Sequence, residues 1–340
     1  MAPNPSDFDA TALEGFLRDA VPGLQGAMQM ERIGGGQSNP TFFVSFARGP
    51  QLVLRKQPPG ELLKSAHAID REYRIQKALG SAGFPVPPML LYCDDRSIIG
   101  TPFYVMERLR GRVLSDYALT SVNLDERRPY LFELAETLAR LHAVDWQAIG
   151  LADYGRPGNF FERQIARWTQ QWLAAKQHDS DDMDRLMAWL PTHIPPDDET
   201  TIAHGDYRLG NVMFHPTEPR IIAVLDWELS TLGHPLADAA YSSLPWSTER
   251  DVFEGLRGLD LEAQGLPTQQ EYLAHYQRCS SRAPVQPFHL VFSLFRFAAI
   301  LEGISARARA GNAAGEDAAQ VGALAGRFAR YAVEIVQADG

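Results

Sequence analysis

The residues with the clearest chemical character lie in the stretch His204-Gly205-Asp206-Tyr207-Arg208-Leu209-Gly210-Asn211 and, farther along the chain, at Asp226. Transfer of a phosphoryl group requires a carboxylate that orients and deprotonates the acceptor hydroxyl, and ligands for Mg²⁺ on the nucleotide phosphates. Mg²⁺ prefers hard oxygen ligands, typically one or two carboxylates together with phosphate and water. An Asp five residues before an Asn, with a second Asp at the end of a following strand, supplies that set. We therefore predict Asp206 as the base, and Asn211 and Asp226 as metal ligands.

Each of these residues, taken alone, has an ordinary structural alternative. Asp206 and Asn211 are of types common in turns, Asp226 is suited to capping a strand, and a single histidine such as His204 more often packs in a core. The phosphoryl-transfer interpretation is favoured because it accounts for all of these residues and their spacing together.

The pattern His-Gly-Asp-x-x-x-x-Asn, followed by a hydrophobic strand and Asp226-Trp227-Glu228, resembles the catalytic core of the aminoglycoside phosphotransferase and choline kinase family, distant relatives of protein kinases. Protein kinases have His-Arg-Asp and Asp-Phe-Gly at the two motifs. Gly205 in place of that Arg, and the lack of a candidate activation loop ending in Ala-Pro-Glu, favour a small-molecule kinase over a protein kinase. The resemblance implies ATP and Mg²⁺ as cofactors and the hydroxyl of a small molecule as acceptor.

Further stretches carry the same resemblance. Gly233 to Asp238 matches the family, and we expect Asp238 to open a helix and to brace the catalytic loop through hydrogen bonds. Leu138 to His142 and Phe160 to Trp168 resemble one branch, which includes the phosphotransferase domains fused to acyl-CoA dehydrogenase-like proteins. This branch suggests a hydroxylated acyl thioester or a related metabolite as acceptor, whereas the acidic net charge would suit a cationic aminoglycoside or an amino alcohol.

The segment from Arg156 to Trp168 is expected to line the acceptor side, and its side chains have two interpretations. Its basic residues either serve an anionic head group or are surface charges; they are Arg156, Arg163 and Arg167. Its aromatic residues either cover an apolar chain or form the core face of a helix; they are Phe160, Phe161 and Trp168.

A glycine-rich stretch precedes the first predicted strand. It contains Gly34, Gly35, Gly36, Ser38 and Asn39. Glycines let a backbone bend tightly over phosphates and present N–H groups to them. The resemblance implies that this stretch is the nucleotide loop, with Asn39 where a protein kinase has its third glycine. An ordinary hairpin turn is the alternative.

Val53-Leu54-Arg55-Lys56 resembles the strand whose cation pairs with the α- and β-phosphates. Alternation along a strand places Val53 and Arg55 on one face and Lys56 on the other, so we assign the cation to Arg55 and keep Lys56 as the alternate. The resemblance makes Glu72, in the helix that follows, the carboxylate that holds this cation. A solvated charge on a helix face is the alternative for Glu72.

Phe103 to Leu109 resembles the strand and hinge that receive adenine through backbone groups, which places Glu107 and Leu109 in the nucleotide site. Arg208 lies two residues after Asp206, where many kinases carry a cation that touches the transferring phosphoryl group. A surface ion pair is the alternative for Arg208.

The elements that must position these residues form two groups along the chain. Hydrophobic patterns predict a small region with strands, including a hairpin, and one helix, followed by a region that is mostly helical. We therefore predict an α+β, protein-kinase-like bilobal fold, with an antiparallel-sheet nucleotide-binding lobe at residues 1–108 and a larger, mostly helical catalytic and substrate-binding lobe at 109–340. The predicted strands are 41–46, 51–55, 89–93, 103–107, 212–215 and 221–226, and the predicted helices are 9–20, 67–79, 129–143, 161–177, 183–189 and most of the chain from 268 onward.

Composition narrows the classes of partner. The chain of 340 residues has a net charge of −10, which argues against sequence-independent binding of nucleic acid. Its two cysteines match no metal or disulfide spacing, and its first residues lack the pattern of a signal peptide, so we expect a cytoplasmic protein. The longest apolar run, Phe288 to Leu301, is too short to span a bilayer, and we expect a buried helix and no membrane partner. The sequence does not predict the oligomeric state.

Two other functions use the same residues. A metal-dependent hydrolase would use a cluster of His204, Asp206 and Asp226, and a non-catalytic module would bind nucleotide without turnover. The kinase interpretation is favoured over the first because it also explains Asn211 and the glycine-rich stretch. It is favoured over the second because Asp206, Asn211 and Asp226 are all present.

Overall fold

The computed structural model describes residues 8–34, 39–60, 68–309, 322 and 324–339. The chain divides into two compact units. Unit 1 comprises the chain up to Gly111 together with Ile149–Leu151 and Ile222–Glu228, and unit 2 comprises Arg112–Ala148, Ala152–Ile221 and Leu229–Gly340. The predicted boundary after residue 108 lies close to the end of the first segment of unit 1, and two short segments of the later chain also belong to unit 1. One of these segments contains Asp226.

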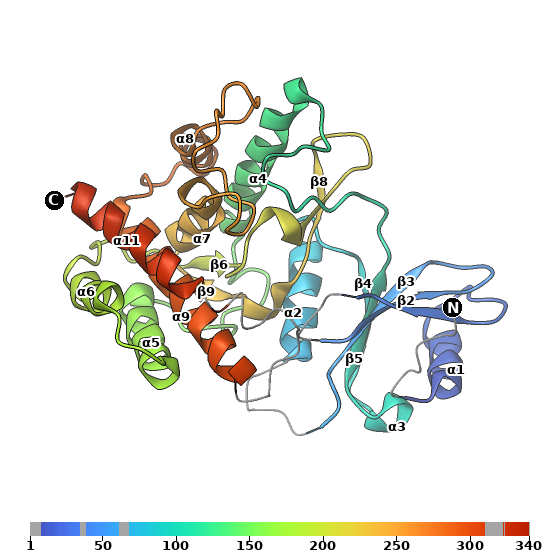
Figure 1. The fold of residues 1–340 in the computed structure, drawn as a ribbon. Helices are drawn as coiled ribbons and strands as arrows, with labels where there is room; N and C mark the ends of the chain where they lie inside the picture. The colour runs from blue at the N-terminus through green and yellow to red at the C-terminus, as the bar shows by residue number, and fades with distance from the viewer. Residues whose placement is uncertain (1–7, 35–38, 61–67, 310–321, 323, 340) are drawn as a thin grey trace. The chain divides into compact units, whose positions relative to one another are not determined.

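Unit 1 is built on a five-stranded antiparallel sheet in the order β1-β2-β3-β5-β4 (Figure 1). Strands β4 and β5 have the predicted bounds. Strand β1 was not predicted from the sequence, because its largely exposed residues give no alternation of buried and exposed positions. The strands are β1 (Gln29–Arg32), β2 (Thr41–Ser45), β3 (Leu52–Lys56), β4 (Met89–Cys93) and β5 (Phe103–Glu107).

The two faces of this sheet carry different residues because side chains alternate along each strand. On one face, Leu52, Leu54 and Phe103 share a buried core with Leu13 and Leu17 of α1 (Ala10–Ala20). The short helix α3 (Arg96–Ile99) packs against α1. The opposite face includes the cross-strand pair Arg55 and Tyr104, and α2 (Ile69–Ser81) packs against β4 and β5.

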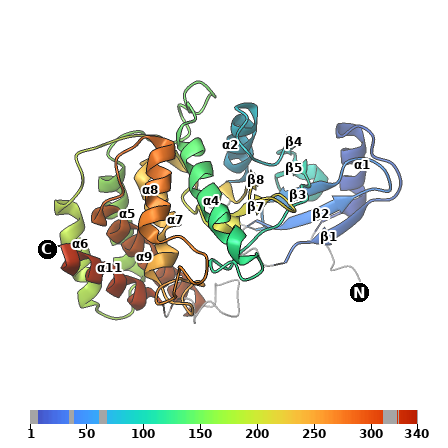
Figure 2. The same ribbon diagram turned by 90° about the horizontal axis from the view of Figure 1, so that it is seen from above.

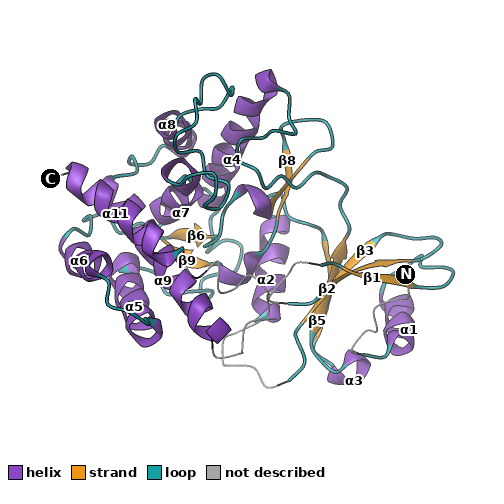
Figure 3. Ribbon diagram, viewed as in Figure 1, coloured by secondary structure: helices purple, strands orange, loops and turns teal. Residues whose placement is uncertain are grey.

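Unit 2 is mostly helical, as the purple ribbons of Figure 3 show. Helix α9 packs against α5, α7 and α11, and α4 packs along α8 (Figure 2). The large core of this unit is formed by apolar side chains from α5, α6, α7, α9 and α11. The helices are α4 (Arg127–His142), α5 (Phe160–Ala175), α6 (Asp181–Trp189), α7 (Pro235–Ser242), α8 (Gln269–Ser280), α9 (Pro287–Arg309) and α11 (Ala325–Asp339).

Helix α9 extends the predicted apolar helix at both ends. Among the described residues, it is the one helix long and apolar enough to cross a membrane by length and composition alone. Within its apolar window, 61% is buried inside the protein, and the buried residues include Phe292 and Phe295. Its packing therefore fits the central helix of a folded core, as the sequence predicts.

Short strands and turns hold the chemically distinctive loop of unit 2. Strand β6 (Thr201–Ala203) pairs antiparallel with β9 (Thr231–Gly233), and the loop between β6 and β7 (Val212–Phe214) contains the single turn Leu209–Asn211. Strand β8 (Ile221–Val224) ends two residues earlier than predicted. The remaining 3₁₀ turns are Leu124–Glu126, Leu190–Thr192, Trp227–Leu229 and Leu244–Ser247.

Candidate active site

Glu72 of α2 is the centre of a buried polar cluster in unit 1. It is only 1% exposed, so the alternative of a solvated helix-face charge is wrong. Asn39 Nδ2 donates a hydrogen bond to its Oε1 at 2.6 Å, and the Tyr104 hydroxyl donates to its Oε2 at 3.2 Å. Arg55 Nε lies 2.8 Å from the same Oε2. Two neutral donors and one cation thus hold this carboxylate in place.

Arg55 contacts two further carboxylates. Its NH2 group lies 3.0 Å from Asp226 Oδ1 and 3.7 Å from Glu228 Oε2. Burial acts to lower the pKa of Arg55, but Tyr104 and the three carboxylates outweigh it and raise the pKa. Burial raises the pKa of Glu72, and repulsion from Asp226 and Glu228 adds to this while Arg55 opposes it. With three carboxylates around one guanidinium, this cluster favours an additional cation.

Asp226 presents one carboxylate oxygen that fits such a cation. Its backbone has φ of 62°, in the left-handed region that aspartate tolerates better than most residues, and this conformation follows the end of β8. The next residue, Trp227, is buried, and its Nε1 donates to the Val224 carbonyl at 3.0 Å, which fixes the turn. Arg55 occupies Oδ1, whereas Oδ2 has no hydrogen-bond partner among the described residues. The Asp226 side chain is 38% exposed, so a metal ion has access to it.

The other predicted nucleotide residues are placed as follows. Gly34 is exposed, and Gly35, Gly36 and Ser38 lie outside the described residues. The Glu107 N–H donates to the Pro88 carbonyl at 2.9 Å. The backbone N–H of Leu109 has no hydrogen-bond partner in the described part of the chain, so it remains able to donate to a ligand.

Lys56, the alternate cation, lies on the other face of β3 from Arg55. It is buried, and its Nζ is 5.3 Å from the centre of the Phe8 ring. This ring belongs to the core that contains α1, whereas Glu72 and Tyr104 lie on the face of Arg55. The strand register is therefore the one that alternation predicts.

In unit 2, the loop that begins at His204 is held by Asp238 of α7. Asp238 accepts hydrogen bonds from the His204 N–H at 2.6 Å and from the Gly205 N–H at 3.0 Å, which confirms the predicted bracing. Burial acts to raise the pKa of Asp238, but His142, His204 and the Gly205 N–H outweigh it and hold the pKa below its usual value. Gly205 has φ of 82°, and a Cβ there would lie 2.6 Å from the Leu229 carbonyl oxygen. A side chain at position 205, such as the arginine of protein kinases, would not fit this backbone.

The Asp206 carboxylate is fixed from two sides. Asn211 Nδ2 donates to Asp206 Oδ2 at 2.8 Å and to the Asp206 carbonyl at 2.9 Å, and the Tyr241 hydroxyl donates to Oδ1. Because both bonds use the amide nitrogen of Asn211, its amide oxygen is left without a hydrogen-bond partner among the described residues. This oxygen suits a hard cation such as Mg²⁺.

Arg208 extends from the same loop. Its Nε lies 3.4 Å from Asp206 Oδ2, and its side chain is 49% exposed. Burial acts to lower the pKa of Arg208, but Asp206, Tyr241 and Tyr117 outweigh it and raise the pKa. Its two terminal nitrogens have no hydrogen-bond partner in the part of the chain that the structure describes, so the guanidinium can reach an anion.

The sequence did not single out Tyr241 or Arg296, although both contact the Asp206 loop. Burial first, and then Asp206, raise the pKa of Tyr241 well above its usual value, so its hydroxyl stays protonated and donates. Arg296 of α9 donates to the Gly205 carbonyl at 2.7 Å. Its guanidinium lies 5.6 Å from the ring centres of both Tyr241 and Trp168. Both residues belong to apolar helical runs, which the sequence marks only as core.

Part of the segment from Arg156 to Trp168, which was expected to line the acceptor side, packs in the core of unit 2. Phe161 and Trp168 are buried among the core residues of unit 2, so their use in covering an apolar chain is wrong and the core interpretation holds. Arg163 donates to the carbonyls of Arg156 and Gly158. A hollow of about 390 Å³ opens beside this segment. It is lined by Arg156, Pro157, Gly158, Asn159, Glu162, Arg163 and Ala166.

The geometry does not favour the metal-dependent hydrolase. His204 is fully buried, and its Nδ1 accepts a hydrogen bond from the Asp206 N–H at 3.2 Å, which commits this histidine to the loop. Among the described residues, the one group of three ligand-type side chains with closely spaced ligand atoms is Glu136, His275 and Cys279. It contains none of the residues that the hydrolase would use.

Comparisons with known sequences agree with the motifs. The model of the phosphotransferase enzyme family matches residues 29–280. The chain is 43% identical to acyl-CoA dehydrogenase family member 11 of Gallus gallus over 341 residues, covering 96% of this chain and 43% of that protein. It is 42% identical to acyl-CoA dehydrogenase family member 10 of Mus musculus over 334 residues, covering 97% of this chain and 31% of that protein. The chain thus spans less than half the length of these curated relatives.

Solved structures agree with the fold. A provisionally named aminoglycoside phosphotransferase of Ralstonia eutropha is 44% identical with a TM-score of 0.88, covering 97% of this chain and 98% of that chain. A spectinomycin phosphotransferase, solved with ADP and spectinomycin, has a TM-score of 0.64 at 11% identity and covers 98% of this chain and 100% of its own. These matches confirm the predicted fold class, an antiparallel-sheet lobe followed by a helical lobe of the protein-kinase type.

Proposed function

We propose that this chain, which belongs to the phosphotransferase enzyme family, is an ATP-dependent kinase that transfers the γ-phosphoryl group to a hydroxyl of a small molecule. The observation that carries the proposal is the Asp206 carboxylate. It is fixed by Asn211 and Tyr241 and mounted on a loop that Asp238 braces. A fixed carboxylate next to a free amide oxygen is the arrangement that phosphoryl transfer requires of a base and its neighbouring metal ligand.

In the proposed reaction, Asp206 orients the acceptor hydroxyl and receives its proton. The hydroxyl oxygen forms a bond to the γ-phosphorus while the bond from that phosphorus to the β–γ bridging oxygen breaks, and ADP leaves with the electron pair. Asp206 Oδ1 accepts one hydrogen bond, from the Tyr241 hydroxyl, and keeps a second lone pair for the proton, whereas Oδ2 accepts from Asn211 Nδ2 and, at 3.4 Å, from Arg208 Nε. Loss of a general base costs about 10²–10⁴-fold in rate, so this one role accounts for a large part of the activity.

The proposed metal ligands are the Asn211 amide oxygen and Asp226 Oδ2. A Mg²⁺ ion held by these two ligands would neutralise charge on the nucleotide phosphates. Arg55, positioned by Glu72, holds the α- and β-phosphates, and Arg208 contacts the phosphoryl group that is transferred. The remaining proposed nucleotide contacts come from Gly34, Gly35, Gly36, Ser38, Asn39, and the backbone of Glu107 and Leu109.

We infer that the acceptor is a hydroxylated metabolite of the acyl thioester class and not an aminoglycoside. The inference is supported by relatives at 42–43% identity whose names refer to acyl-CoA dehydrogenases. It is also supported by Arg156 and Arg163 at the hollow, because cations there suit an anionic group and repel a polyamine. We place the reaction in the cytoplasm, where ATP and Mg²⁺ are supplied.

A phosphoryl-acceptor screen tests this proposal. Purified protein with ATP and Mg²⁺ is offered hydroxyacyl thioesters, amino alcohols and kanamycin-like compounds, and ADP release is measured together with mass spectrometry of the product. We expect a phosphorylated hydroxyacyl thioester, equal turnover with Asp184→Asn as a matched exposed control, and loss of turnover with Asp206→Asn. Phosphorylation of an aminoglycoside at about 10⁴ M⁻¹s⁻¹ or better in kcat/KM, the low end of ordinary enzymes, would overturn the acceptor class. A screen without any phosphorylated product would overturn the kinase itself.

A further inference from the structure

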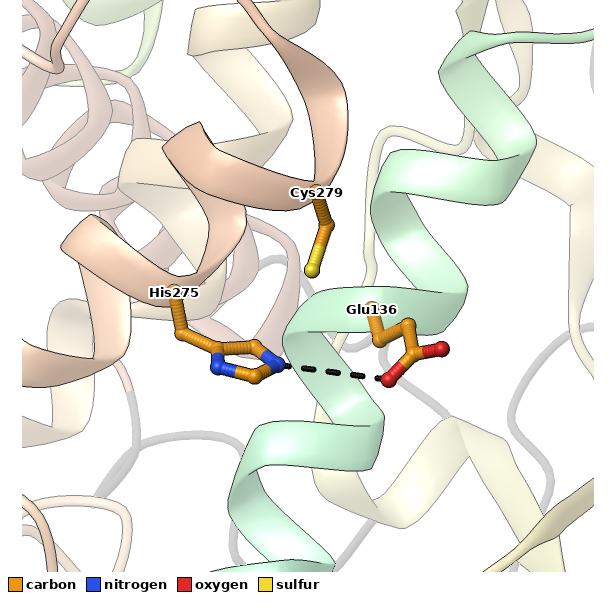
Figure 4. Close-up of side chains that lie close together, drawn as sticks. All are labelled: Glu136, His275 and Cys279. Atoms are coloured by element: carbon orange, nitrogen blue, oxygen red, sulfur yellow. Dashed lines mark ion pairs between the residues drawn. The ribbon is translucent and has the colours of Figure 1, made fainter.

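A second group of chemically capable side chains lies in unit 2, in residues that the proposed reaction does not use. Figure 4 shows Glu136 of α4 facing His275 and Cys279 of α8. One ligand atom from each residue, a carboxylate oxygen, a ring nitrogen and a sulfur, lies within 4.8 Å of the other two. His275 Nε2 is 4.0 Å from Glu136 Oε2. This combination of three ligand types is unlike an ordinary surface ion pair.

Helix geometry explains why the three side chains meet. His275 and Cys279 are four residues apart on α8, so they project from the same face one turn from each other. Glu136 and Phe132 have the same spacing on α4, which packs along α8. The Phe132 ring stacks on the His275 ring, with centroids 4.5 Å apart and planes at 11°. This stacking fixes the imidazole plane and aims its edge toward Glu136.

The His275 ring nitrogen that faces Glu136 is available to a ligand. Its Nε2 is buried and has no hydrogen-bond partner among the described residues. Burial first, and then Arg278, lower the pKa of His275, so the imidazole is neutral at pH 7. Neutral imidazole, thiolate and carboxylate are the three ligand types that Zn²⁺ takes in proteins.

We propose that Glu136, His275 and Cys279 bind a transition metal ion of the Zn²⁺ class, with water completing a tetrahedral site. Bond lengths of about 2.0–2.3 Å place the ligand atoms of such a site about 3.3–3.8 Å apart. The present separations, up to 4.8 Å, need only small side-chain rotations to reach that range. One carboxylate and one thiolate also balance the two charges of the ion.

Two adjustments accompany binding. Burial and Glu136 raise the pKa of the Cys279 thiol, so the metal displaces the thiol proton, which passes to solvent. Arg278 donates to His275 Nδ1 at 3.3 Å, whereas a metal on Nε2 requires the ring proton on Nδ1. The Arg278 side chain must therefore turn away, which it is free to do because the residue is exposed.

The ion would join α4 to α8, and these helices are linked to the catalytic loop through His142 and Asp238. His142 at the end of α4 already contacts α8 through a 2.7 Å hydrogen bond between its Nδ1 and the Tyr276 hydroxyl. His142 Nε2 lies 3.6 Å from Asp238 Oδ2, the oxygen that accepts the His204 N–H. A metal between α4 and α8 is thus a structural link that stabilises the support of the loop, and it takes no part in the phosphoryl transfer.

Cobalt titration of the full chain tests the site. After treatment with a chelator, Co²⁺ is added and the sulfur-to-cobalt charge-transfer absorption is recorded, and thermal unfolding is measured with and without Zn²⁺. For the wild type we expect an absorption band that saturates at one Co²⁺ per protein chain, and a higher Tm in the presence of Zn²⁺. The matched controls Cys93→Ser and His178→Ala should behave in the same way. Cys279→Ser loses the band. His275→Ala weakens binding by more than the roughly 10–100-fold that loss of an outer partner of a ligand causes.

The outcomes are unambiguous and do not depend on the kinase activity. The proposal is overturned if wild-type protein shows no thiolate–cobalt band, or if the band is unchanged in Cys279→Ser. It is also overturned if His178→Ala weakens binding as much as His275→Ala does, because the ion is then held by surface histidines in general. The Glu136→Gln variant tests whether Glu136 is the third ligand. If this variant binds Co²⁺ as tightly as the wild type does, Glu136 is not a ligand and the proposed three-residue site is wrong.

Discussion

Replacing Arg55 with alanine removes the guanidinium that lies 2.8 Å from Glu72, 3.0 Å from Asp226 and 3.7 Å from Glu228. Glu72 is 1% exposed, so water cannot take the place of the lost charge. Deleting one partner of a buried ion pair costs about 3–5 kcal/mol. Asn39 and Tyr104 still donate to Glu72, so we expect a loss near the lower end, about 3 kcal/mol.

The free energy of unfolding in urea measures this loss. A matched control is Lys176→Ala, which breaks the exposed ion pair between Lys176 and Asp179, and an exposed pair contributes less than about 1 kcal/mol. The double variant Arg55→Ala with Glu72→Gln should recover at least half of the loss, because the unpaired charge is gone. A single variant as stable as the control, or a double variant without recovery, would refute the buried-charge argument.

The pH dependence of Arg55→Ala gives an independent check. Burial already raises the pKa of Glu72 above its ordinary 4.5, and Arg55 opposes that rise, so the variant raises the pKa further. The folded variant then binds a proton more readily than the unfolded chain does, and its stability falls as the pH rises above 4.5 through the raised pKa. We expect the stability loss to be larger at pH 8 than at pH 5. Equal losses at the two pH values would contradict this assignment.

Three further predictions concern turnover and nucleotide binding. Arg55→Met raises the KM for ATP more than Lys56→Met does, because only Arg55 lies on the face of β3 that is turned toward Glu72. Steady-state kinetics that show the reverse order would contradict this strand register. Asp226→Ala weakens Mg²⁺-dependent ATP binding more than Asn211→Ala does, because a carboxylate offers the metal a charge and an amide offers only a dipole. Titration of Mg·ATP into both variants measures the two losses of affinity, and equal losses would contradict these roles. Tyr241→Phe lowers kcat about tenfold, the equivalent of one hydrogen bond of about 1.4 kcal/mol, and leaves the Kd for ATP unchanged; an unchanged kcat would remove Tyr241 from the positioning of Asp206.

Much of the fold was predictable because local pattern and tertiary structure agree. The aliphatic and aromatic runs of β4 and β5 begin directly after Pro88 and Pro102 and end before charged residues, and both strands have the predicted bounds. The apolar spacing predicted α4 within two residues at each end. Strands β6 and β9 were not predicted, because their pairing joins segments about 30 residues apart and no local pattern shows it.

The sequence predicted the site residues that lie in recognisable motifs, but not the contacts that depend on tertiary packing. The sequence identified Asp226 as chemically distinctive but not its place in unit 1, because its partner Arg55 is 171 residues away. The predicted strand through Asp226 ends at Val224 instead, since the left-handed backbone of Asp226 cannot continue it. Tyr241 was missed because a tyrosine within the apolar helix α7 has the signature of a core residue. Its hydrogen bond to Asp206 depends on how the loop and helix pack together.

The role of Asp206 is tested most directly by single-turnover transfer of the γ-phosphoryl group in the Asp206→Asn variant, measured together with the Kd for Mg·ATP. Asparagine keeps the shape of the side chain and removes its capacity to take a proton. If Asp206 is the base, the rate of transfer falls by about 10²–10⁴-fold, the usual contribution of a general base, and the Kd for Mg·ATP stays within a few-fold of the wild type. A variant that transfers the phosphoryl group at nearly the wild-type rate would contradict the assignment of Asp206 as the base.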